Sequence, residues 1–485
     1  MGTLVEVELR PESVERFSTI TGRDAIQALQ ELSARIRAEA PGRIVWNVNS
    51  TAVGGGVAEM LRPLLSYARG LGIDARWVVI GGSPEFFRIT KRLHNALHGE
   101  LGDGSPLGDA ERRIYEAKIH ENAQDLLALV RPGDAVILHD PQTAGLVHGL
   151  HAAGAMIIWR CHIGADDRNE QTALGWRFLE PYVTAADVCV FSRAAYAPEL
   201  LDPDRVVVIQ PWIDPFSAKN QDLDPDTVRG ILVHVGVITG EAGPTSFVRS
   251  DGSPGRVDRC ADVVRLGPPP RADTPLVVQV SRWDDLKDPI GVMHGFGELG
   301  PATCGAHLLL VGPNVHAVAD DPDGARVFEE VVTAFRALPH HARSMVHLVC
   351  LPTRDVEENA AIVNAIQRHA AVVVQKSLRE GFGLTVTEAM WKARPIVASA
   401  VGGIVDQIDD GVHGLLLRDP RDHPAFARAV ERLLCDRPFA EALGAAARRR
   451  ARERFVGLRS LVEYAAVIER GVAAGAPPRA AARDQ

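Results

Sequence analysis

Short apolar runs alternate with segments of helical periodicity along almost the whole chain. The run at 43–48 leads through a glycine loop into apolar residues at helical spacing: Val57, Met60, Leu61, Leu64, Leu65, Ala68 and Leu71. Further apolar runs predict strands at 75–80, 134–139, 155–160, 187–192 and 205–210. Strands separated by helix-length segments are typical of βαβ units, in which helices cover both faces of a parallel sheet.

The pattern breaks at residues 213–272, which are rich in Pro, Gly and Asp, and then restarts. We interpret this stretch as a linker followed by an insertion of uncertain order. The second series of apolar runs predicts strands at 275–281, 307–312, 346–351, 371–375 and 395–399. The chain is therefore predicted to hold an N-terminal domain at 1–212 and a C-terminal domain at 273–454.

The predicted architecture is α/β, with two Rossmann-like domains, each a doubly wound parallel sheet, facing a cleft between them. A hinge is predicted near Pro211–Pro215. The helical segment from about 455 is expected to pack back on the N-terminal domain. The last residues, 475–485, are expected to be disordered because they are rich in Pro, Ala and charge.

Charge and composition narrow the class of protein. The formal net charge of −9 argues against a nucleic-acid partner, which would require a basic surface. The N-terminus has no signal-peptide core, and no apolar run approaches the roughly 20 residues of a membrane span. The six cysteines are scattered without CxxC spacing, which favours neither a zinc ribbon nor a disulfide framework. We therefore expect a cytoplasmic protein that binds no membrane.

Two cations follow the first strand of the C-terminal domain. Arg282 and Lys287 lie in the sequence SRWDDLKD, directly after the strand at 275–281. Ligands bind at the carboxyl ends of strands in open parallel sheets, so this pair suits a diphosphate clamp. The alternative is that both are solvated surface charges, paired weakly with Asp284, Asp285 or Asp288.

Two carboxylates flank a glycine turn after the strand at 371–375. Glu380 precedes the turn of Gly381, Phe382 and Gly383. The following helix is predicted to start near Thr385, with Glu388 in its first turns. Free N–H groups at the start of that helix can bind a sugar or phosphate oxygen, and both carboxylates can accept hydrogen bonds from sugar hydroxyls. The alternative for Glu388 is stabilisation of the helix dipole alone.

Polar residues also gather at the strand ends of the N-terminal domain. A glycine loop, Gly54, Gly55 and Gly56, opens a helix and suits a phosphate, although it is neither GxGxxG nor GxxxxGK[ST]. A tight turn without a ligand is the alternative. The other polar side chains expected at this edge are Asn49, Ser50, Thr51, His139, Asp140, Arg160 and His162.

The stretch REGFGLTVTEAMWKARPIVASAVGGIVDQIDDGVHGLLL resembles the donor-binding region of retaining glycosyltransferases of family 4, which have the GT-B fold. VNSTAVGGGVAEML, LHDPQTAGL, WRCHIG and IDPFSAKN in the N-terminal half are similar to the glycosyltransferring trehalose synthases. The resemblance covers nearly the whole chain. It implies transfer of glucose, with retention, from a nucleoside-diphosphate glucose to free glucose, giving trehalose.

The resemblance also implies roles for individual residues. The donor would be bound by Gly55, Gly56, Arg282, Lys287, Glu380, Gly381, Phe382, Gly383, Leu384 and Glu388, with Glu388 on the ribose and Glu380 on the transferred glucose. The acceptor would be bound by Asn49, Asp140, Arg160 and His162. Arg282, Lys287, Glu380 and His162 would be the catalytic residues. No metal site and no cofactor are expected, and a non-essential effect of Mg²⁺ is left open.

Three alternatives remain open at this point. A related retaining transferase with another acceptor would keep every donor residue. A sugar-nucleotide epimerase would share the architecture without an acceptor site. A non-catalytic regulatory homologue would not need Arg282, Lys287, Glu380 and Glu388 intact. The partners expected are small molecules, and the formation of a homodimer is left open. The identity of the nucleoside diphosphate (ADP, UDP or GDP) is also left open.

Overall fold

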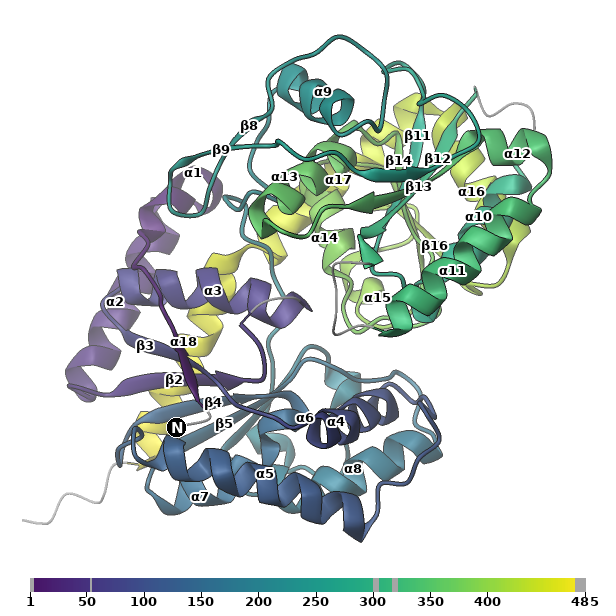
Figure 1. The fold of residues 1–485 in the computed structure, drawn as a ribbon. Coiled ribbons are helices and arrows are strands. Elements are labelled where there is room, and N and C mark those ends of the chain that lie inside the picture. The colour runs from purple at the N-terminus through teal and green to yellow at the C-terminus, as the bar shows by residue number, and fades with distance from the viewer. Residues whose placement is uncertain (1–3, 53–54, 300–304, 316–321, 476–485) are drawn as a thin grey trace, which may run out of the picture. The chain divides into compact units, whose positions relative to one another are not determined.

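The computed structural model describes residues 4–52, 55–299, 305–315 and 322–475. The chain divides into two compact units (Figure 1). Unit 1 comprises Met1–Trp212 and Gly457–Gln485, and unit 2 comprises Ile213–Val456. The chain therefore passes from one unit to the other twice, at Trp212 and at Val456, and the first passage falls within the predicted hinge.

Unit 1 is built on a seven-stranded sheet with the order β1-β3-β2-β4-β5-β6-β7. Its strands are β1 (Val5–Val7), β2 (Ile44–Asn49), β3 (Asp74–Val79), β4 (Ala135–His139), β5 (Met156–Cys161), β6 (Val188–Phe191) and β7 (Val206–Val208). All neighbours pair in parallel except β1, which runs antiparallel to β3. The edge strand β1 gave no signal in the sequence because it has three residues and little burial.

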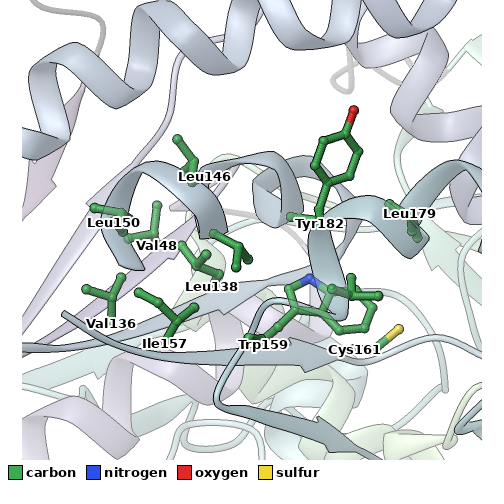
Figure 2. Close-up of a cluster of buried hydrophobic side chains, with 14 of the residues drawn as sticks. Val48, Val136, Leu138, Leu146, Leu150, Ile157, Trp159, Cys161, Leu179 and Tyr182 are labelled. Atoms are coloured by element: carbon green, nitrogen blue, oxygen red, sulfur yellow. The ribbon is translucent and has the colours of Figure 1, made fainter. Parts of the chain in front are cut away.

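Helices cover both faces of this sheet. They are α1 (Ser18–Thr21), α2 (Arg23–Glu39), α3 (Gly55–Gly70), α4 (Pro84–Leu97), α5 (Asp109–Leu127), α6 (Asp140–Thr143), α7 (Val147–Ala152), α8 (Glu170–Val183) and α18 (Gly457–Gly475). Figure 2 shows the core on one face, where Leu138 and Trp159 of the strands meet Leu150 and Leu179 of the helices. On the other face Val467 of α18 packs with residues of α2 and the strands, so the C-terminal helix belongs to unit 1.

Unit 2 repeats the design with the strand order β10-β13-β12-β11-β14-β15-β16. The strands are β10 (Asp262–Val264), β11 (Leu276–Val280), β12 (His307–Pro313), β13 (Val346–Leu351), β14 (Val372–Gln375), β15 (Ile396–Ser399) and β16 (Leu415–Leu417). Only β10 pairs antiparallel among them. Successive residues of β11 point to opposite faces: Leu276 and Val278 enter one core and Val277 the other.

The helices of unit 2 are α9 (Pro225–His234), α10 (Pro289–Gly297), α11 (Pro322–Ala337), α12 (His340–Met345), α13 (Val356–His369), α14 (Leu384–Trp391), α15 (Ile404–Gln407), α16 (His423–Cys435) and α17 (Arg437–Arg454). None of the helices in the described part of the chain is long and apolar enough to cross a membrane.

Residues 213–272, which the sequence suggested to be a linker and an insertion, are folded into unit 2. They form α9, the hairpin of β8 (Ser246–Val248) and β9 (Pro254–Arg256), and the edge strand β10. The side chain of Arg249 donates to Asp355 at 2.7 Å, and the buried Glu358 accepts from the backbone N–H of Asp258 at 2.7 Å. The Asp and Pro residues that looked like loop signals include a helix cap, since Asp224 accepts from Asp226 and Thr227 at the start of α9.

The predicted disorder of the C-terminus falls almost wholly on residues 476–485, which lie outside the described residues. The strands predicted from apolar runs correspond to β2–β7 and β11–β15, and no boundary differs by more than two residues, which is within the usual uncertainty of boundaries.

A hydrogen-bonded histidine pair in unit 2 makes stability depend on pH. His307 and His347 lie with ring centroids 5.1 Å apart and nearly parallel, joined by a 2.8 Å hydrogen bond. Burial, with smaller contributions from His307 and Arg265, lowers the pKa of His347 to about 3. The unfolded chain binds a proton near the ordinary histidine pKa of about 6.5. Stability is therefore lost as the pH falls from that value toward the folded-state pKa.

We expect His347→Phe, which keeps an aromatic ring beside His307 but cannot bind a proton, to remove this contribution. When the pH is lowered from about 7 to about 5, the free energy of unfolding should fall in the wild type by more than in the variant. The difference between the two losses should be about 1–2 kcal/mol. Urea denaturation at the two pH values measures the difference. Equal losses in both proteins would show that His347 titrates normally in the folded state.

Candidate active site

The residues predicted from the sequence lie at the carboxyl ends of the parallel strands, each set within its own unit. In unit 1, Asn49 ends β2, while Arg160 lies near the end of β5 and His162 follows it. In unit 2, Arg282 and Lys287 follow β11, and Glu380 follows β14. The cleft expected to bring the two sets together stays a prediction.

Lys287 and Glu380 form an ion pair in unit 2. The Nζ of Lys287 lies 2.6 Å from Oε2 of Glu380, and both side chains are largely buried. The same carboxylate oxygen accepts a hydrogen bond from the hydroxyl of Ser377 at 3.1 Å. The structure thus joins a cation and a carboxylate that are 93 residues apart in the sequence. A charge-assisted contact of this kind holds both groups in fixed positions.

A second ion pair, which contains a fully buried lysine, fixes the loop that carries Lys287. Lys376 is fully buried and pairs with Asp288, which also caps α10 by accepting from Gly291 N–H at 3.1 Å. The N–H of Leu378 donates to the carbonyl of Leu286 at 2.8 Å. Asp288 has a positive φ of 49°, which costs energy for a residue other than glycine and persists only where surrounding contacts hold it. No motif in the sequence indicated a role for Lys376. A lysine directly after a buried strand nevertheless indicates a buried charge that needs a partner.

The glycine turn adopts the conformation its sequence requires. Gly383 has φ 88° and ψ 62°, in the left-handed region, and α14 starts at Leu384. Phe382 is buried and packs edge-on against Phe455 at 5.8 Å. The carbonyl of Gly381 accepts from Gly403 N–H at 3.2 Å. The turn is therefore held on both sides, and it keeps the N-terminus of α14 close to Glu380.

Glu388 lies on the second turn of α14 and is buried. Its carboxylate accepts from the side-chain amide of Gln367 at 3.3 Å, and the Nζ of Lys219 lies 3.6 Å away. Its expected role in binding a ribose stays a prediction. Lys219 lies in the segment expected to be a linker, and no motif in the sequence indicated it. Its partner Glu388 is 169 positions away, so no local pattern links the two residues.

Arg282 behaves differently from Lys287. Its side chain is 57% exposed and donates to the carboxylate of Asp284 at 3.0 Å. This is the arrangement that the sequence analysis named as the alternative to a diphosphate clamp. An exposed pair of this kind contributes at most about 1 kcal/mol, so the guanidinium can exchange Asp284 for another anion at little cost.

The polar edge of unit 1 centres on two histidines. Nδ1 of His139 lies 3.0 Å from Nε2 of His162, and Nε2 of His139 lies 3.1 Å from Oδ1 of Asn47. The backbone N–H of His162 donates to Oδ1 of Asp140 at 2.8 Å. Asp140 has a positive φ of 63°, which is again sterically unfavourable and is held by these contacts. Asn47, which no motif indicated, could have been found from its phase in β2, two residues before Asn49.

Burial sets the protonation of this edge. It raises the pKa of Asp140 to about 7, against the opposing effects of the His162 N–H and of Arg160. Burial, followed by Arg160, lowers the pKa of His139 to about 3 and that of His162 well below its usual range. Both imidazoles are therefore neutral at pH 7, because the buried site disfavours their charged forms.

Arg160 and Asn49 occupy the same edge in different ways. Arg160 is 2% exposed and donates to the hydroxyl of Ser192 at 3.2 Å, while its Nε and its other terminal nitrogen have no partner among the described residues. Asn49 accepts from the indole of Trp77 at 2.8 Å and donates to the carbonyl of Thr51 at 2.7 Å. Arg160 thus retains donors for a ligand, whereas Asn49 braces the loop after β2.

The glycine loop is partly outside this description. Gly55 and Gly56 are the first residues of α3, while Gly54 is outside the described residues. Their expected contact with phosphates stays a prediction. Among the residues that the structure describes, no three His, Cys, Asp or Glu side chains lie close enough together to hold a metal ion.

Comparisons with known proteins connect both units to one family. The family model for the trehalose synthase N-terminal domain matches residues 47–198, and that for glycosyl transferases group 1 matches residues 355–450. The chain is 33% identical over 460 residues to a trehalose synthase of Pyrococcus horikoshii, covering 94% of this chain and 95% of that protein. It is 36% identical over 448 residues to a trehalose synthase of Rubrobacter xylanophilus, covering 92% and 94%.

A solved structure shows the same fold. The trehalose-6-phosphate synthase OtsA matches with a TM-score of 0.66 at 14% identity, covering 88% of this chain and 99% of that one. At this identity the likeness concerns the fold alone. The fold class predicted from the sequence, two Rossmann-like α/β domains of the GT-B type, is confirmed.

We expect Gly383→Ala to destabilise the turn before α14. A Cβ there would lie 3.2 Å from Cγ of Glu380, and the left-handed conformation costs about 1–2 kcal/mol for residues other than glycine. Urea denaturation should show a loss of that size. The matched control is Gly297→Ala at the end of α10, where an added Cβ meets nothing within 4 Å and stability should not fall. Equal stability of Gly383→Ala and the wild type would contradict the argument.

Proposed function

This chain belongs to the trehalose synthase family of glycosyltransferases, and on that premise we propose that it is a retaining hexosyltransferase that moves glucose from a nucleoside-diphosphate glucose to free glucose. The product is trehalose. The observation that carries the proposal is the Lys287–Glu380 pair at the start of α14, because it provides a cation for a leaving diphosphate and a carboxylate for sugar hydroxyls.

The proposed donor residues in unit 2 form a charged set that a diphosphate can enter. Lys287 is paired with Glu380, and Arg282 is paired with Asp284. A diphosphate carries more charge than either carboxylate and offers both cations stronger contacts. Glu380 would then be released to accept hydrogen bonds from the glucose. Cations that are already in place need little reorganisation when the sugar–phosphate bond breaks.

The proposed acceptor edge of unit 1 suits a neutral sugar. His139 and His162 are neutral, and the pKa of Asp140 is raised to about 7, so this carboxyl is protonated in a large fraction of molecules at neutral pH. Arg160 keeps donors available for hydroxyl oxygens. Sugar hydroxyl groups both donate and accept hydrogen bonds. They therefore match this edge, which offers both donors and acceptors and in which Arg160 carries the fixed charge.

Retention follows in this proposal from attack on the face that the leaving group departs from. The bond between the anomeric carbon and the phosphate oxygen breaks, and the acceptor hydroxyl oxygen bonds to the same carbon. The departing phosphate oxygen takes the proton of that hydroxyl. A double displacement would need a carboxylate able to bond to the anomeric carbon. In this proposal Glu380 accepts hydrogen bonds from the glucose hydroxyls and Glu388 is buried, which disfavours both as that nucleophile.

The assay that tests the proposal combines several donors with several acceptors. We expect trehalose, identified by NMR of its linkage, only when a nucleotide glucose and free glucose are both present, with release of nucleoside diphosphate in equal amount. Parallel reactions with ADP-, UDP- and GDP-glucose identify the nucleoside, and reactions with and without Mg²⁺ test whether the two cations suffice. Trehalose formed from maltose, or from glucose 1-phosphate without a nucleotide, would overturn the proposal.

The same assay separates the alternatives. A product with a sugar other than glucose would indicate a related transferase. Release of nucleoside diphosphate that does not depend on added glucose would indicate an epimerase. Binding of the nucleotide sugar without turnover would indicate a regulatory protein.

We expect Lys287→Ala and Arg282→Ala each to lower kcat by roughly a hundredfold, or ~3 kcal/mol of transition-state stabilisation, because each removes a charge that meets the leaving diphosphate. Steady-state kinetics, with donor binding measured by calorimetry, separates catalysis from binding. The control is Arg271→Ala, whose side chain is 80% exposed and pairs with Asp273. A loss of binding that accounts for the whole effect would argue against a catalytic role.

A further inference from the structure

The polar side chains of unit 1 share one face of the sheet. Val45 of β2 and Ile137 of β4 enter the core formed with α2 and α18, and side chains two residues further along point the same way. Asn47 and His139 occupy those positions, and both are at least 98% buried. The apolar core on this face is thus replaced by hydrogen-bonding groups as the strands approach their carboxyl ends.

These groups form a chain of three side chains: Asn47, His139 and His162. The two links measure 3.1 Å and 3.0 Å, and the imidazole rings lie nearly parallel, at 16° with centroids 5.3 Å apart. One end of the chain is the Oδ1 of Asn47. The other end is Nδ1 of His162, a buried nitrogen without a partner among the described residues.

In the structure the amide of Asn47 directs Oδ1 to Nε2 of His139, and its Nδ2 is buried without a partner among the described residues. With the amide in this orientation, the proton positions along the three side chains follow from Asn47. The two imidazoles are neutral, so each has one N–H donor and one acceptor nitrogen. An amide oxygen can only accept, so Nε2 of His139 carries its proton and Nδ1 of His139 is an acceptor. Nε2 of His162 must then be the donor in the second link. Nδ1 of His162 is consequently left with a lone pair.

The ring of His162 is also oriented from its backbone. The backbone N–H of His162 donates to Oδ1 of Asp140, and the backbone carbonyl of Asp140 accepts from the indole N–H of Trp159 at 3.2 Å. The main chain and the ring are therefore fixed by separate contacts. A buried acceptor without a partner is costly, and a hydrogen bond from a ligand offsets that cost.

We infer that Asn47 and His139 are positioning residues that hold His162 as the Nε2–H tautomer, so that its Nδ1 accepts a hydrogen bond from a hydroxyl of the bound sugar. The identity of that sugar rests on the proposed function. Asn47 and His139 touch no substrate in this account and act only through His162. We call Asn47, His139 and His162 the relay. It favours a ligand that donates a hydrogen bond to Nδ1 of His162, as a hydroxyl does.

The first test needs no activity. In protein with ¹⁵N-labelled histidine, His162 should show one protonated ring nitrogen, Nε2, and one unprotonated ring nitrogen, Nδ1. Its signals are assigned by their loss in His162→Gln. His139→Phe keeps a ring of similar size but removes the acceptor, and the tautomer signature of His162 should change. A protonated Nδ1 in the wild type, or an unchanged signature in His139→Phe, would overturn the inference.

The second test uses the glucosyl transfer reaction. His139→Phe should lower kcat/KM for the acceptor about tenfold to a hundredfold, which is the effect of losing one buried hydrogen bond, and leave KM for the donor unchanged. His139→Asn places an amide oxygen near the former Nδ1 and should restore most of the activity. If His139→Phe does not fold, Asn47→Leu removes the other link and is measured in the same way.

The matched control is His347→Phe in unit 2. It replaces one imidazole of a second hydrogen-bonded histidine pair, His307 and His347, with a phenyl ring. His347 is remote in sequence from every proposed site residue, so this variant should keep wild-type kinetics. An active enzyme in which neither the His139 variants nor Asn47→Leu change acceptor kcat/KM would refute the relay. A wild-type protein that transfers no glucose would refute the proposed function instead, and the ¹⁵N signature would still decide the tautomer.

Discussion

The buried pair of Lys376 and Asp288 is the contact on which the candidate donor site depends. A fully buried ammonium is stable only with a partner, and breaking such a pair costs about 3–5 kcal/mol. The pair joins the end of β14 to the start of α10, which are far apart in sequence. Lys287 is adjacent to Asp288, and Glu380 lies four residues after Lys376. The Lys376–Asp288 pair therefore helps to fix the positions of Lys287 and Glu380.

The two units present different electrostatics at equivalent places in the fold. Both carry their polar residues where parallel strands end, because loops leave the sheet there and main-chain groups are unpaired. Unit 2 holds cations matched by carboxylates, which a diphosphate can displace. Unit 1 holds neutral imidazoles and a carboxyl whose pKa is raised by burial, which suits hydroxyl groups. The proposed function assigns the charged donor to unit 2 and the neutral acceptor to unit 1 on the basis of this difference.

Local signals in the sequence were sufficient wherever the structure is locally determined. Buried strands were recognised as apolar runs, and the glycine turn between Glu380 and Glu388 was recognised from its residues. They failed where stability comes from distant partners. The segment 213–272 has the composition of a loop, yet it folds because Arg249 and the backbone of Asp258 bind the carboxylates of Asp355 and Glu358. No window of neighbouring residues contains both sides of these contacts.

The sequence by itself determined the fold class and the candidate edges of the two sheets, because periodicity and glycine placement act over a few residues. The family followed from the resemblance of longer stretches to known members. It also placed Lys287, Glu380 and His162 among the candidates. Only the tertiary structure decided which of them meet and in what protonation state. Burial and hydrogen bonding depend on atoms brought together from distant strands, as when Asn47 sets the proton positions on His139 and thereby those on His162.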